Sequence, residues 1–352
     1  MNAQQDNPTA KMETYKHLYT QICTKENICK AYRKARLGKR KKFYVRKFES
    51  DVDANIEQLH QQLRDESWTP LPYKQFTAYE PKERLIRAPQ FPDRIVHHAL
   101  IRMLEPIYNK ILIYDTYASR KNKGTHATVD RLTRFLRRDN DNVFVFHGDV
   151  RKFFDNIDHE TLIKILRKKI VDERVITLIK KILTNQGISL GVTLGNYTSQ
   201  WFANIYLSEL DYFAKHNLKV KHYIRYMDDF LLLSDSKPEL HRWKHQIEKF
   251  LNERLKLELH PVKRQIFPTN IGIDFVGYTI WKDHKKLRRR DVNRFISRLN
   301  EFDKLPVMTP FAEASLMSWK GYSIHADAFG LTKQLHKSHP AMQVSTLDRY
   351  IN

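Results

Sequence analysis

Three aspartates stand at positions where carboxylates could act together on a metal ion. Asp149 comes near the end of an apolar run that reads as a buried strand. Asp228 and Asp229 lie between residues 222–226 and 230–233, which are rich in β-branched and aromatic side chains. Those two runs predict a β-hairpin with both carboxylates at its tight turn. Adjacent ionised carboxylates repel each other and therefore favour an external cation, for which Mg²⁺ is the candidate.

Each of these positions also has a simpler explanation. An Asp-Asp pair is more often a solvated turn, although a solvated turn is seldom followed by an apolar run such as Phe-Leu-Leu-Leu. Asp149 could be a helix N-cap, but residues 153–159 intervene before the next amphipathic helix, and Asp158 is the better cap. With Asp228 and Asp229, Asp149 would then form a three-carboxylate site for two Mg²⁺ ions about 3.5 to 4 Å apart.

A site of this kind transfers nucleotidyl groups without a protein nucleophile. One ion would lower the pKa of a primer 3′-hydroxyl and align it on the α-phosphorus, while the other would hold the triphosphate and stabilise departing pyrophosphate. Mn²⁺ is the alternative ion. The sequence has no convincing Ser-His-Asp or Cys-His arrangement, which agrees with such chemistry.

The composition calls for a polyanionic partner. The chain has 352 residues, of which 41% are apolar, and this is enough for a sizeable core in two or three packed subdomains. Its net charge of +22 would only destabilise the compact state by self-repulsion unless a polyanion offsets it. Nucleic acid is therefore the first candidate and an acidic membrane the second.

The sequence shows no features typical of membrane proteins, secreted proteins or zinc-binding proteins. No apolar run approaches the length of a membrane span, and the amino-terminal residues lack the apolar core of a signal peptide. Cys23 and Cys29 have no nearby His partners at zinc spacing, which predicts buried or incidental thiols. We therefore expect a cytoplasmic protein without a membrane partner.

The elements that must position the carboxylates begin with helices. Residues 15–22 and 56–63 each carry apolar side chains at helical spacing, and residues 30–47 between them form the densest basic stretch of the chain. That stretch is either a solvated helix end or a contact for a phosphate backbone, with aromatic side chains available for stacking. The net charge favours the second interpretation, in which Arg33 and Arg40 contact primer or template without sequence specificity.

A second predicted hairpin has its strands at residues 74–79 and 84–88. Pro81 suits the second position of a type I turn, which puts Lys82 at the tip and Arg84 on the returning strand. These cations could be simple surface charge. They could also close over the triphosphate of an incoming nucleotide, whose oxygens a guanidinium binds in bidentate fashion.

The order of these motifs resembles that of reverse transcriptases. Residues 226–229, Tyr-Met-Asp-Asp, resemble the Tyr-x-Asp-Asp box of that family. Further similar segments, in chain order, are the second sequence block (82–94), a template-handling block (117–126), the fourth palm motif (257–263), the primer-grip block (272–278) and a thumb segment (318–327). The resemblance runs from about residue 70 to about residue 335 in consistent order.

The resemblance implies an α+β fold with right-hand polymerase architecture, in which fingers, a palm with an antiparallel sheet and helices, and a helical thumb follow one another. We expect residues 1–90 to form an N-terminal extension and fingers. Residues 91–285 would form the palm, with remaining fingers segments at about 112–148 and 184–198, and residues 286–352 the thumb.

The resemblance also implies roles for single residues. Lys263 would protonate departing pyrophosphate, although a surface lysine fits the sequence equally well. Phe154 would lie under the sugar of the incoming nucleotide and select deoxynucleotides, whereas Phe153 is expected in the core. The predicted sets are catalytic Asp149, Asp228, Asp229 and Lys263; metal-binding Asp149, Val150, Asp228 and Asp229; nucleotide-binding Lys82, Arg84, Phe154, Leu194, Gly195, Ser199 and Gln200; and primer- or template-binding Tyr226, Met227, Gly277, Tyr278, Arg33 and Arg40.

Residues 191–200 are the most discriminating segment. Their paired glycines let the backbone approach nucleotide and template closely. Many reverse transcriptases have Gln-Gly followed by Ser-Pro here, whereas this chain has Leu194 before Gly195, and then Ser199 and Gln200. The pattern resembles the reverse transcriptases of diversity-generating retroelements and implies an error-prone enzyme that copies a template RNA and misincorporates opposite adenines. Leu194 lacks the hydrogen bonds of a Gln, so base-pair geometry would be selected less strictly.

Three functional hypotheses stay open from the sequence. The first is the diversity-generating enzyme, bacterial or phage-encoded, with template RNA, cDNA or primer, dNTPs and, by resemblance, a small basic helical accessory protein as partners. The second is a group II intron-like or phage-defence reverse transcriptase; the short chain after the thumb segment speaks against a maturase. The third is a catalytically inactive RNA-binding scaffold with a polymerase fold, which would have no reason to keep repelling carboxylates.

Overall fold

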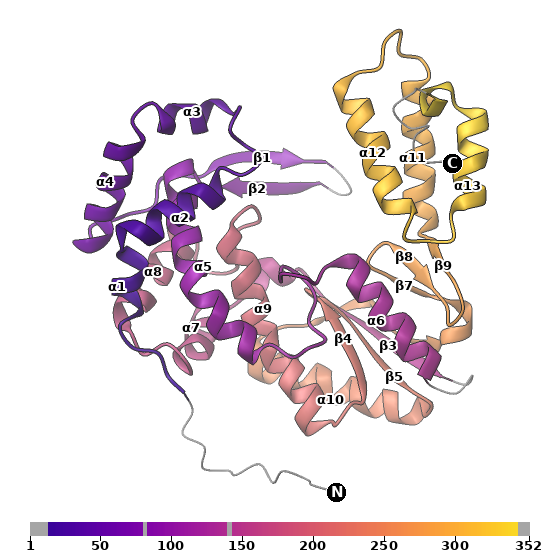
Figure 1. Ribbon diagram of the computed structural model, residues 1–352. Coiled ribbons are helices and arrows are strands. Elements are labelled where there is room, and N and C mark those ends of the chain that lie inside the picture. Colours follow the sequence, from indigo (N-terminus) through magenta and orange to yellow (C-terminus); the bar gives the residue numbers. More distant parts are fainter. Residues whose placement is uncertain (1–12, 80–82, 139–142, 344–352) are drawn as a thin grey trace, which may run out of the picture. The chain divides into compact units, whose positions relative to one another are not determined.

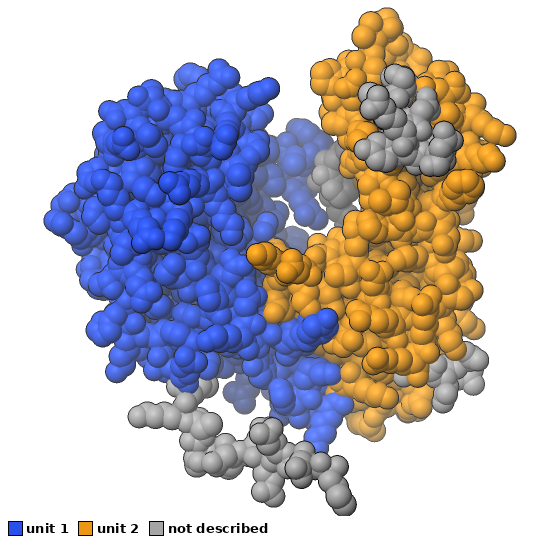
Figure 2. Space-filling view, viewed as in Figure 1, with its two compact units in different colours: residues 1–114, 149–219, 245–263 blue, residues 115–148, 220–244, 264–352 orange. Residues whose placement is uncertain are grey.

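Two compact units make up the protein, seen in a computed structural model that describes residues 13–79, 83–138 and 143–343. The first unit comprises residues 1–114, 149–219 and 245–263. The second comprises residues 115–148, 220–244 and 264–352 (Figure 2). The chain passes repeatedly from one unit to the other, so neither unit is a continuous segment.

Helices dominate the first unit. They are α1 (Leu18–Cys23), α2 (Lys25–Ala35), α3 (Phe43–Glu49), α4 (Val52–Arg64), α5 (Phe91–Ile111), α7 (His159–Arg167), α8 (Glu173–Leu183) and α9 (Tyr197–Tyr212), with a 3₁₀ turn η1 (Phe153–Asn156) (Figure 1). Helix α5 has a proline in its first turn, where no intrahelical donor is lost. Helices α1, α2, α3 and α9 pack against α5, whose Ile95, Ala99 and Leu100 are fully buried.

The hairpin predicted ahead of α5 is present. Strands β1 (Lys74–Ala78) and β2 (Arg84–Ala88) pair antiparallel, in a register that runs from Lys74 opposite Ala88 to Ala78 opposite Arg84. Arg84 is exposed at the start of β2. The predicted turn residues Pro81 and Lys82 lie outside the described residues.

A four-stranded sheet carries the aspartates singled out in the sequence. Its strand order is β4 (His222–Tyr226), β5 (Asp229–Ser234), β3 (Phe144–Val150) and β6 (Leu259–Pro268). Strands β4 and β5 pair antiparallel with Tyr226 opposite Asp229, which confirms the predicted hairpin. Strand β5 begins one residue earlier than predicted. The middle residues of β4 and β5 are buried on both faces, as expected for strands that are covered on each side.

The rest of the second unit consists of a small sheet and four helices within the described residues. Strands β7 (Ile273–Phe275), β8 (Tyr278–Ile280) and β9 (Lys285–Leu287) form the sheet, and α6 (Thr125–Arg138) packs on β4 and β8. Helices α11 (Arg289–Phe302), α12 (Pro310–Ser323) and α13 (Phe329–Ser338) form a group of their own (orange to yellow in Figure 1). Phe295 of α11 stacks on Trp319 of α12 at 3.9 Å between ring centroids. Helix α10 (Lys237–Leu255) is shared by the two units.

Two simpler properties concern the helices and the cysteines. Among residues 13–79, 83–138 and 143–343, no helix combines the length and the apolar character that crossing a membrane requires. Cys23 is buried and Cys29 is half-buried, and both are free thiols.

Candidate active site

Asp149 is a buried carboxylate with a lysine as its counter-ion. It is the last residue but one of β3 and is only 9% exposed. Lys263 Nζ, from β6, lies 2.6 Å from Asp149 Oδ2. A buried carboxylate is costly unless it is paired, so this contact stabilises the charge. Asp158 is the helix cap, as predicted: its Oδ1 accepts a hydrogen bond from Thr161 N at 2.9 Å and begins α7.

An arginine inside the sheet holds the turn that carries the paired aspartates. Met227 has a φ of 59°, the left-handed conformation that tight two-residue hairpin turns use. Arg225 is fully buried, and its Nη1 donates a hydrogen bond to Met227 O at 2.8 Å. The guanidinium therefore fixes the turn from within the sheet. Asp228 is half-buried in that turn.

Asp229 begins β5 and is held by a histidine of the neighbouring strand. His147 Nε2 lies 2.5 Å from Asp229 Oδ1. His147 stands two residues before Asp149 in β3, and alternate residues of a strand share a face. The same face of β3 thus carries the histidine that contacts Asp229 and, two positions on, Asp149.

Phe154 and the glycine segment form one rigid piece within the first unit. Phe153 is buried, as predicted, and its ring meets that of half-buried Phe154 edge-on at 5.7 Å. Val192 N donates to Phe154 O at 2.7 Å. Gly191 has a φ of +81°, and a Cβ there would lie 2.8 Å from Phe154 O, so only glycine allows this approach.

The next segment docks on strand β2. Arg87 N donates to Leu194 O at 3.0 Å. Gly195 has a φ of +116°, and a Cβ there would come within 3.1 Å of Arg87 O. Ser199 is buried in the first turn of α9 and Gln200 is exposed. The structure therefore brings Leu194 and Gly195 to the strand that starts at Arg84.

Lysines of the basic stretch lie near His98 of α5, whose ring packs on the start of α9. Arg33 and Arg40 are exposed, and Phe43 beyond them is 80% exposed. Burial first, and then the nearby charges of the basic stretch, lower the pKa of His98 to about 4. The ring of His98 stacks on Tyr197, the first residue of α9, at 4.5 Å. Because Arg33 and Arg40 are exposed, they are accessible to a phosphate backbone.

The segment that resembles a primer grip is a strained turn that helix α12 holds. Val276 and Gly277 have φ values of 45° and 94°, and positive φ is costly for a β-branched residue. Gly277 O accepts hydrogen bonds from Arg288 N at 3.0 Å and from Tyr322 Oη. Tyr278 is fully buried and donates to Tyr322 O at 3.0 Å. Tyr226, of the other turn, is half-buried.

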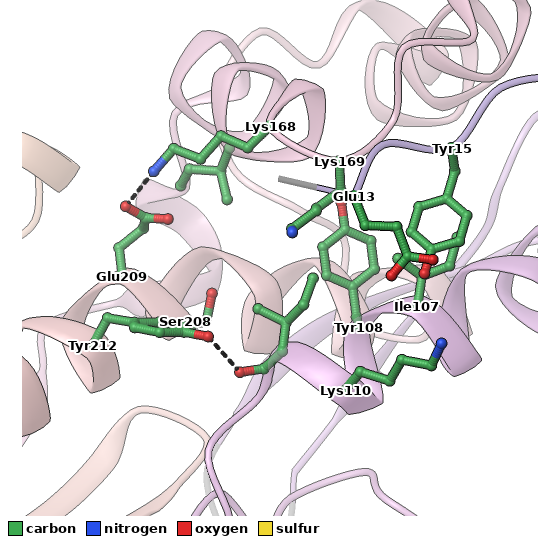
Figure 3. Close-up of a pocket in the computed structure, with 12 residues that line it drawn as sticks. Glu13, Tyr15, Ile107, Tyr108, Lys110, Lys168, Lys169, Ser208, Glu209 and Tyr212 are labelled. Atoms are coloured by element: carbon green, nitrogen blue, oxygen red, sulfur yellow. Dashed lines mark hydrogen bonds and ion pairs between the residues drawn. The ribbon is translucent and has the colours of Figure 1, made fainter. Parts of the chain in front are cut away.

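A cavity of about 530 Å³ in the first unit lies apart from these predicted site residues, since none of them lines it. Helices α5, α7 and α9 and residues 13–15 enclose it (Figure 3). Lys168 Nζ pairs with Glu209 at 2.6 Å, and Tyr212 Oη donates to Ile111 O at 3.1 Å. These two contacts each occupy a polar side chain of the cavity lining.

The carboxylates of the sheet fit a divalent ion by their chemistry. Carboxylate oxygens are the ligands that Mg²⁺ prefers. Asp149 and Asp229 each already contact a nitrogen group, Lys263 and His147, which occupies part of the space around the oxygens. In the part of the chain that the structure describes, however, no three His, Cys, Asp or Glu side chains gather closely enough to form a metal site. The assignment of Asp149, Val150, Asp228 and Asp229 as metal ligands therefore stays a prediction.

Two contributors to this region were missed in the sequence. The sequence pattern indicates only a strand at Arg225, although its guanidinium holds the turn. His147 lies in the apolar strand before Asp149, and its neighbours in the sequence indicate no role for it. Its signal was the two-residue spacing from Asp149, which places both side chains on one face of a strand.

The chain is similar to known proteins over most of this region. The family model for reverse transcriptase (RNA-dependent DNA polymerase) matches residues 74–280, which is more than half of the chain. The group II intron-encoded protein LtrA of Lactococcus lactis subsp. cremoris is 24% identical over 327 residues, covering 70% of this chain and 54% of LtrA. Protein YkfC of Escherichia coli (strain K12) is 27% identical over 279 residues, covering 65% of this chain and 71% of YkfC.

The chain thus spans about half the length of LtrA. Among solved structures, apo telomerase from Candida tropicalis, truncated from its C-terminal domain, aligns with a TM-score of 0.49 at 13% identity, covering 66% of this chain and 60% of that one. The matched family segment contains strand β3 with Asp149, residues 191–200 and the hairpin of Asp228 and Asp229. The predicted fold class is confirmed, and the chain belongs to the reverse transcriptase (RNA-dependent DNA polymerase) family.

Proposed function

We propose that the protein is an RNA-directed DNA polymerase that copies a template RNA into cDNA. The observation that carries this proposal is the family match over residues 74–280, a segment that contains Asp149, Asp228 and Asp229. A catalytically inactive scaffold would gain nothing from a buried Asp149 that needs a lysine counter-ion. We therefore favour an active enzyme over a catalytically inactive scaffold.

Polymerases are among the enzymes that use two-metal sites. In this chain, Asp149, Asp228 and Asp229, with the backbone carbonyl of Val150, would hold two Mg²⁺ ions, and Mn²⁺ is the alternative. When bound, such ions activate the primer hydroxyl and neutralise charge on the triphosphate. The contact between Arg225 and Met227 O supports this role, because it keeps the hairpin turn in one conformation.

Substrate selection is proposed to depend on groups of the first unit. Lys82 and Arg84 would bind the triphosphate and Phe154 would exclude a 2′-hydroxyl. Gly191 packs closely against the backbone of Phe154, which supports a fixed position of Phe154 against the sugar. Lys263, whose Nζ lies 2.6 Å from Asp149 Oδ2, would donate a proton to departing pyrophosphate.

Primer and template are proposed to lie along the basic and turn segments. Arg33 and Arg40 would meet phosphates, while the turns at Met227 and Gly277 would touch the primer. We keep the proposed division into fingers (1–90), palm (91–285) and thumb (286–352), with further fingers segments at about 112–148 and 184–198.

The sub-family is a finer proposal. Residues 194–200 favour an enzyme of a diversity-generating retroelement, with template-directed errors opposite adenine and a small basic helical accessory protein as partner. The similarity to LtrA favours a second candidate, a group II intron-like reverse transcriptase. The two differ in fidelity, since Leu194 in place of a hydrogen-bonding Gln should relax base selection only in the first.

One experiment tests both levels of the proposal. The purified protein is given a primed RNA of defined sequence with Mg²⁺ and either dNTPs or rNTPs, and the products are sequenced. We expect cDNA from dNTPs, with errors concentrated opposite template adenines. Absence of any extension would refute the polymerase proposal, whereas accurate cDNA would refute only the retroelement sub-family and support the group II intron-like alternative.

A further inference from the structure

We propose that the cavity enclosed by α5, α7 and α9 binds a 5′-nucleotide, with its base against tyrosine rings and its phosphate against the ammonium groups of Lys110 and Lys169. The ligand is either a free mononucleotide or an unpaired nucleotide of a bound RNA, which share this chemistry. None of the predicted site residues lines the cavity, so the inference goes beyond the proposed function and does not depend on polymerase activity.

The cavity has the size and the walls of a small-molecule site. Its volume of about 530 Å³ lies within the range of about 300–1,000 Å³ that is typical of ligand pockets. Tyr15, Tyr108 and Tyr212 line it together with three isoleucines (Figure 3). Tyrosine rings are general platforms for nucleic-acid bases, because every base has a π-face that can stack.

Hydrogen bonds hold two of these tyrosines in place before any ligand binds. Tyr108 Oη donates to Leu166 O at 3.3 Å, and Tyr212 Oη donates to Ile111 O at 3.1 Å. The hydroxyls are therefore occupied, and the rings are fixed as parts of the wall. A site that is already formed avoids much of the ordering cost of binding.

Two cations of the lining are available to a phosphate. Lys168 is occupied, since its Nζ pairs with Glu209 at 2.6 Å. Among the residues that the structure describes, no carboxylate forms an ion pair with the ammonium group of Lys110 or Lys169. The lining as a whole has three lysines against two glutamates, so its charge balance suits a ligand with one phosphate better than a triphosphate.

A peptide segment of a partner protein suits the cavity less well. An extended peptide gains affinity by pairing with a free strand edge. Tyr15 already uses its backbone in such a pairing, because Tyr15 N donates to Lys169 O at 2.8 Å and Val171 N donates to Tyr15 O at 3.3 Å. Most of the other lining residues belong to helices, whose backbone groups bond within the helix.

Photo-crosslinking with 8-azidoadenosine 5′-monophosphate tests the proposal on the full chain, in the absence of divalent ions and primer. The labelled protein is digested, and the modified peptides are identified by mass spectrometry. We expect saturable labelling of peptides that contain Tyr15, Tyr108 or Tyr212. Labelling confined to other peptides would overturn the proposal. Because the assay needs neither metal nor primer, its failure would leave the proposed polymerase function untouched.

Charge reversal at one lysine separates the cavity from the general attraction of a basic protein. Lys169→Glu removes a charge-assisted contact to the phosphate and should weaken labelling about tenfold or more. Lys164→Glu is the matched control, because Lys164 is exposed on α7, does not line the cavity and changes the net charge equally. Melting temperatures check folding, and Lys110→Glu repeats the test if Lys169→Glu does not fold. Equal labelling of the cavity variant and the control would overturn the phosphate contact.

Competition shows which parts of the ligand are recognised. Unlabelled AMP should displace the probe, whereas adenosine or inorganic phosphate at the same concentration should not, because each supplies only half of the contacts. Displacement by either one as strong as that by AMP would overturn the assignment to a nucleotide. A probe that AMP fails to displace, as expected if the cavity serves a protein partner, would overturn it as well.

A last arm of the same assay distinguishes the two sources of the nucleotide. Displacement by single-stranded oligo(A) would support the proposal with an unpaired nucleotide of RNA as the ligand. Displacement by AMP but not by oligo(A) would support it with a free mononucleotide as the ligand.

Discussion

Gly148→Ala tests how tightly the hairpin of the paired aspartates is packed against β3. A Cβ at position 148 would lie 2.4, 2.7 and 3.0 Å from three ring carbons of Phe230. Ordinary van der Waals contact begins near 3.4 Å, so the nearest carbon must retreat by about 1 Å (3.4 − 2.4). Phe230 is fully buried between Phe146 and Tyr223, at 6.0 and 6.2 Å between ring centroids, and has little room to move.

The expected cost follows from that displacement. Overpacking of a buried site by one methyl costs roughly 1–3 kcal/mol, and ~1 kcal/mol lowers the melting temperature by about 2–4 °C in units of this size class. Phe230 directly follows Asp229, so the carboxylate should shift with it. Misplacement of a reacting group by about 1 Å can cost on the order of 100-fold in rate. We therefore expect a drop of several degrees and a larger loss of dNTP incorporation.

Differential scanning calorimetry and single-nucleotide primer extension measure the two effects. Gly330→Ala is the matched control, because nothing lies within 4 Å of a Cβ at that position in α13, and alanine is favoured over glycine in a helix. The control should melt at or slightly above the wild-type temperature. The reasoning is refuted if Gly148→Ala behaves like Gly330→Ala in both assays.

Three further substitutions test other parts of the account. Phe154→Val should raise the use of rNTPs relative to dNTPs about tenfold, measured by competition on one template, and an unchanged ratio would remove the sugar gate. Leu194→Gln should reduce errors opposite adenine in sequenced cDNA, and an identical error spectrum would remove that mechanism. Burial raises the pKa of Asp93 to about 7, whereas an Asp in the unfolded chain titrates at about 3.9. The folded state therefore binds a proton that the unfolded chain releases, and the stabilisation that this gives at low pH is lost as the pH rises from about 4 to about 7. Asp93→Asn should abolish that loss in urea denaturation across a pH series; parallel curves would contradict it.

Local patterns predicted the elements that present the site. The two runs around the paired aspartates gave the β4–β5 hairpin because strands at a tight turn depend only on neighbouring residues. The same holds for β1 and β2 and for the cap at Asp158, whose oxygen bonds an amide three residues on. Phe153 in the core followed from its apolar side chain next to a strand end.

Contacts between distant segments could not be predicted in this way. Nothing in the residues around Gly148 says that Phe230, far along the chain, covers it. The pairing of His147 with Asp229 spans 82 positions and depends on which strands become neighbours. Helix α9 begins at Tyr197, and its first turn buries the polar Ser199, which no local apolar pattern indicates.

The most direct test of the central claim is primer extension by Asp228→Asn beside Asp235→Asn. Both residues belong to the same hairpin, but Asp235 is exposed just beyond the end of β5, away from the turn. With dNTPs, Mg²⁺ and a primed RNA, the account predicts that Asp228→Asn abolishes incorporation while Asp235→Asn keeps the wild-type rate. Incorporation by Asp228→Asn at the wild-type rate would contradict a carboxylate-held metal site at this turn.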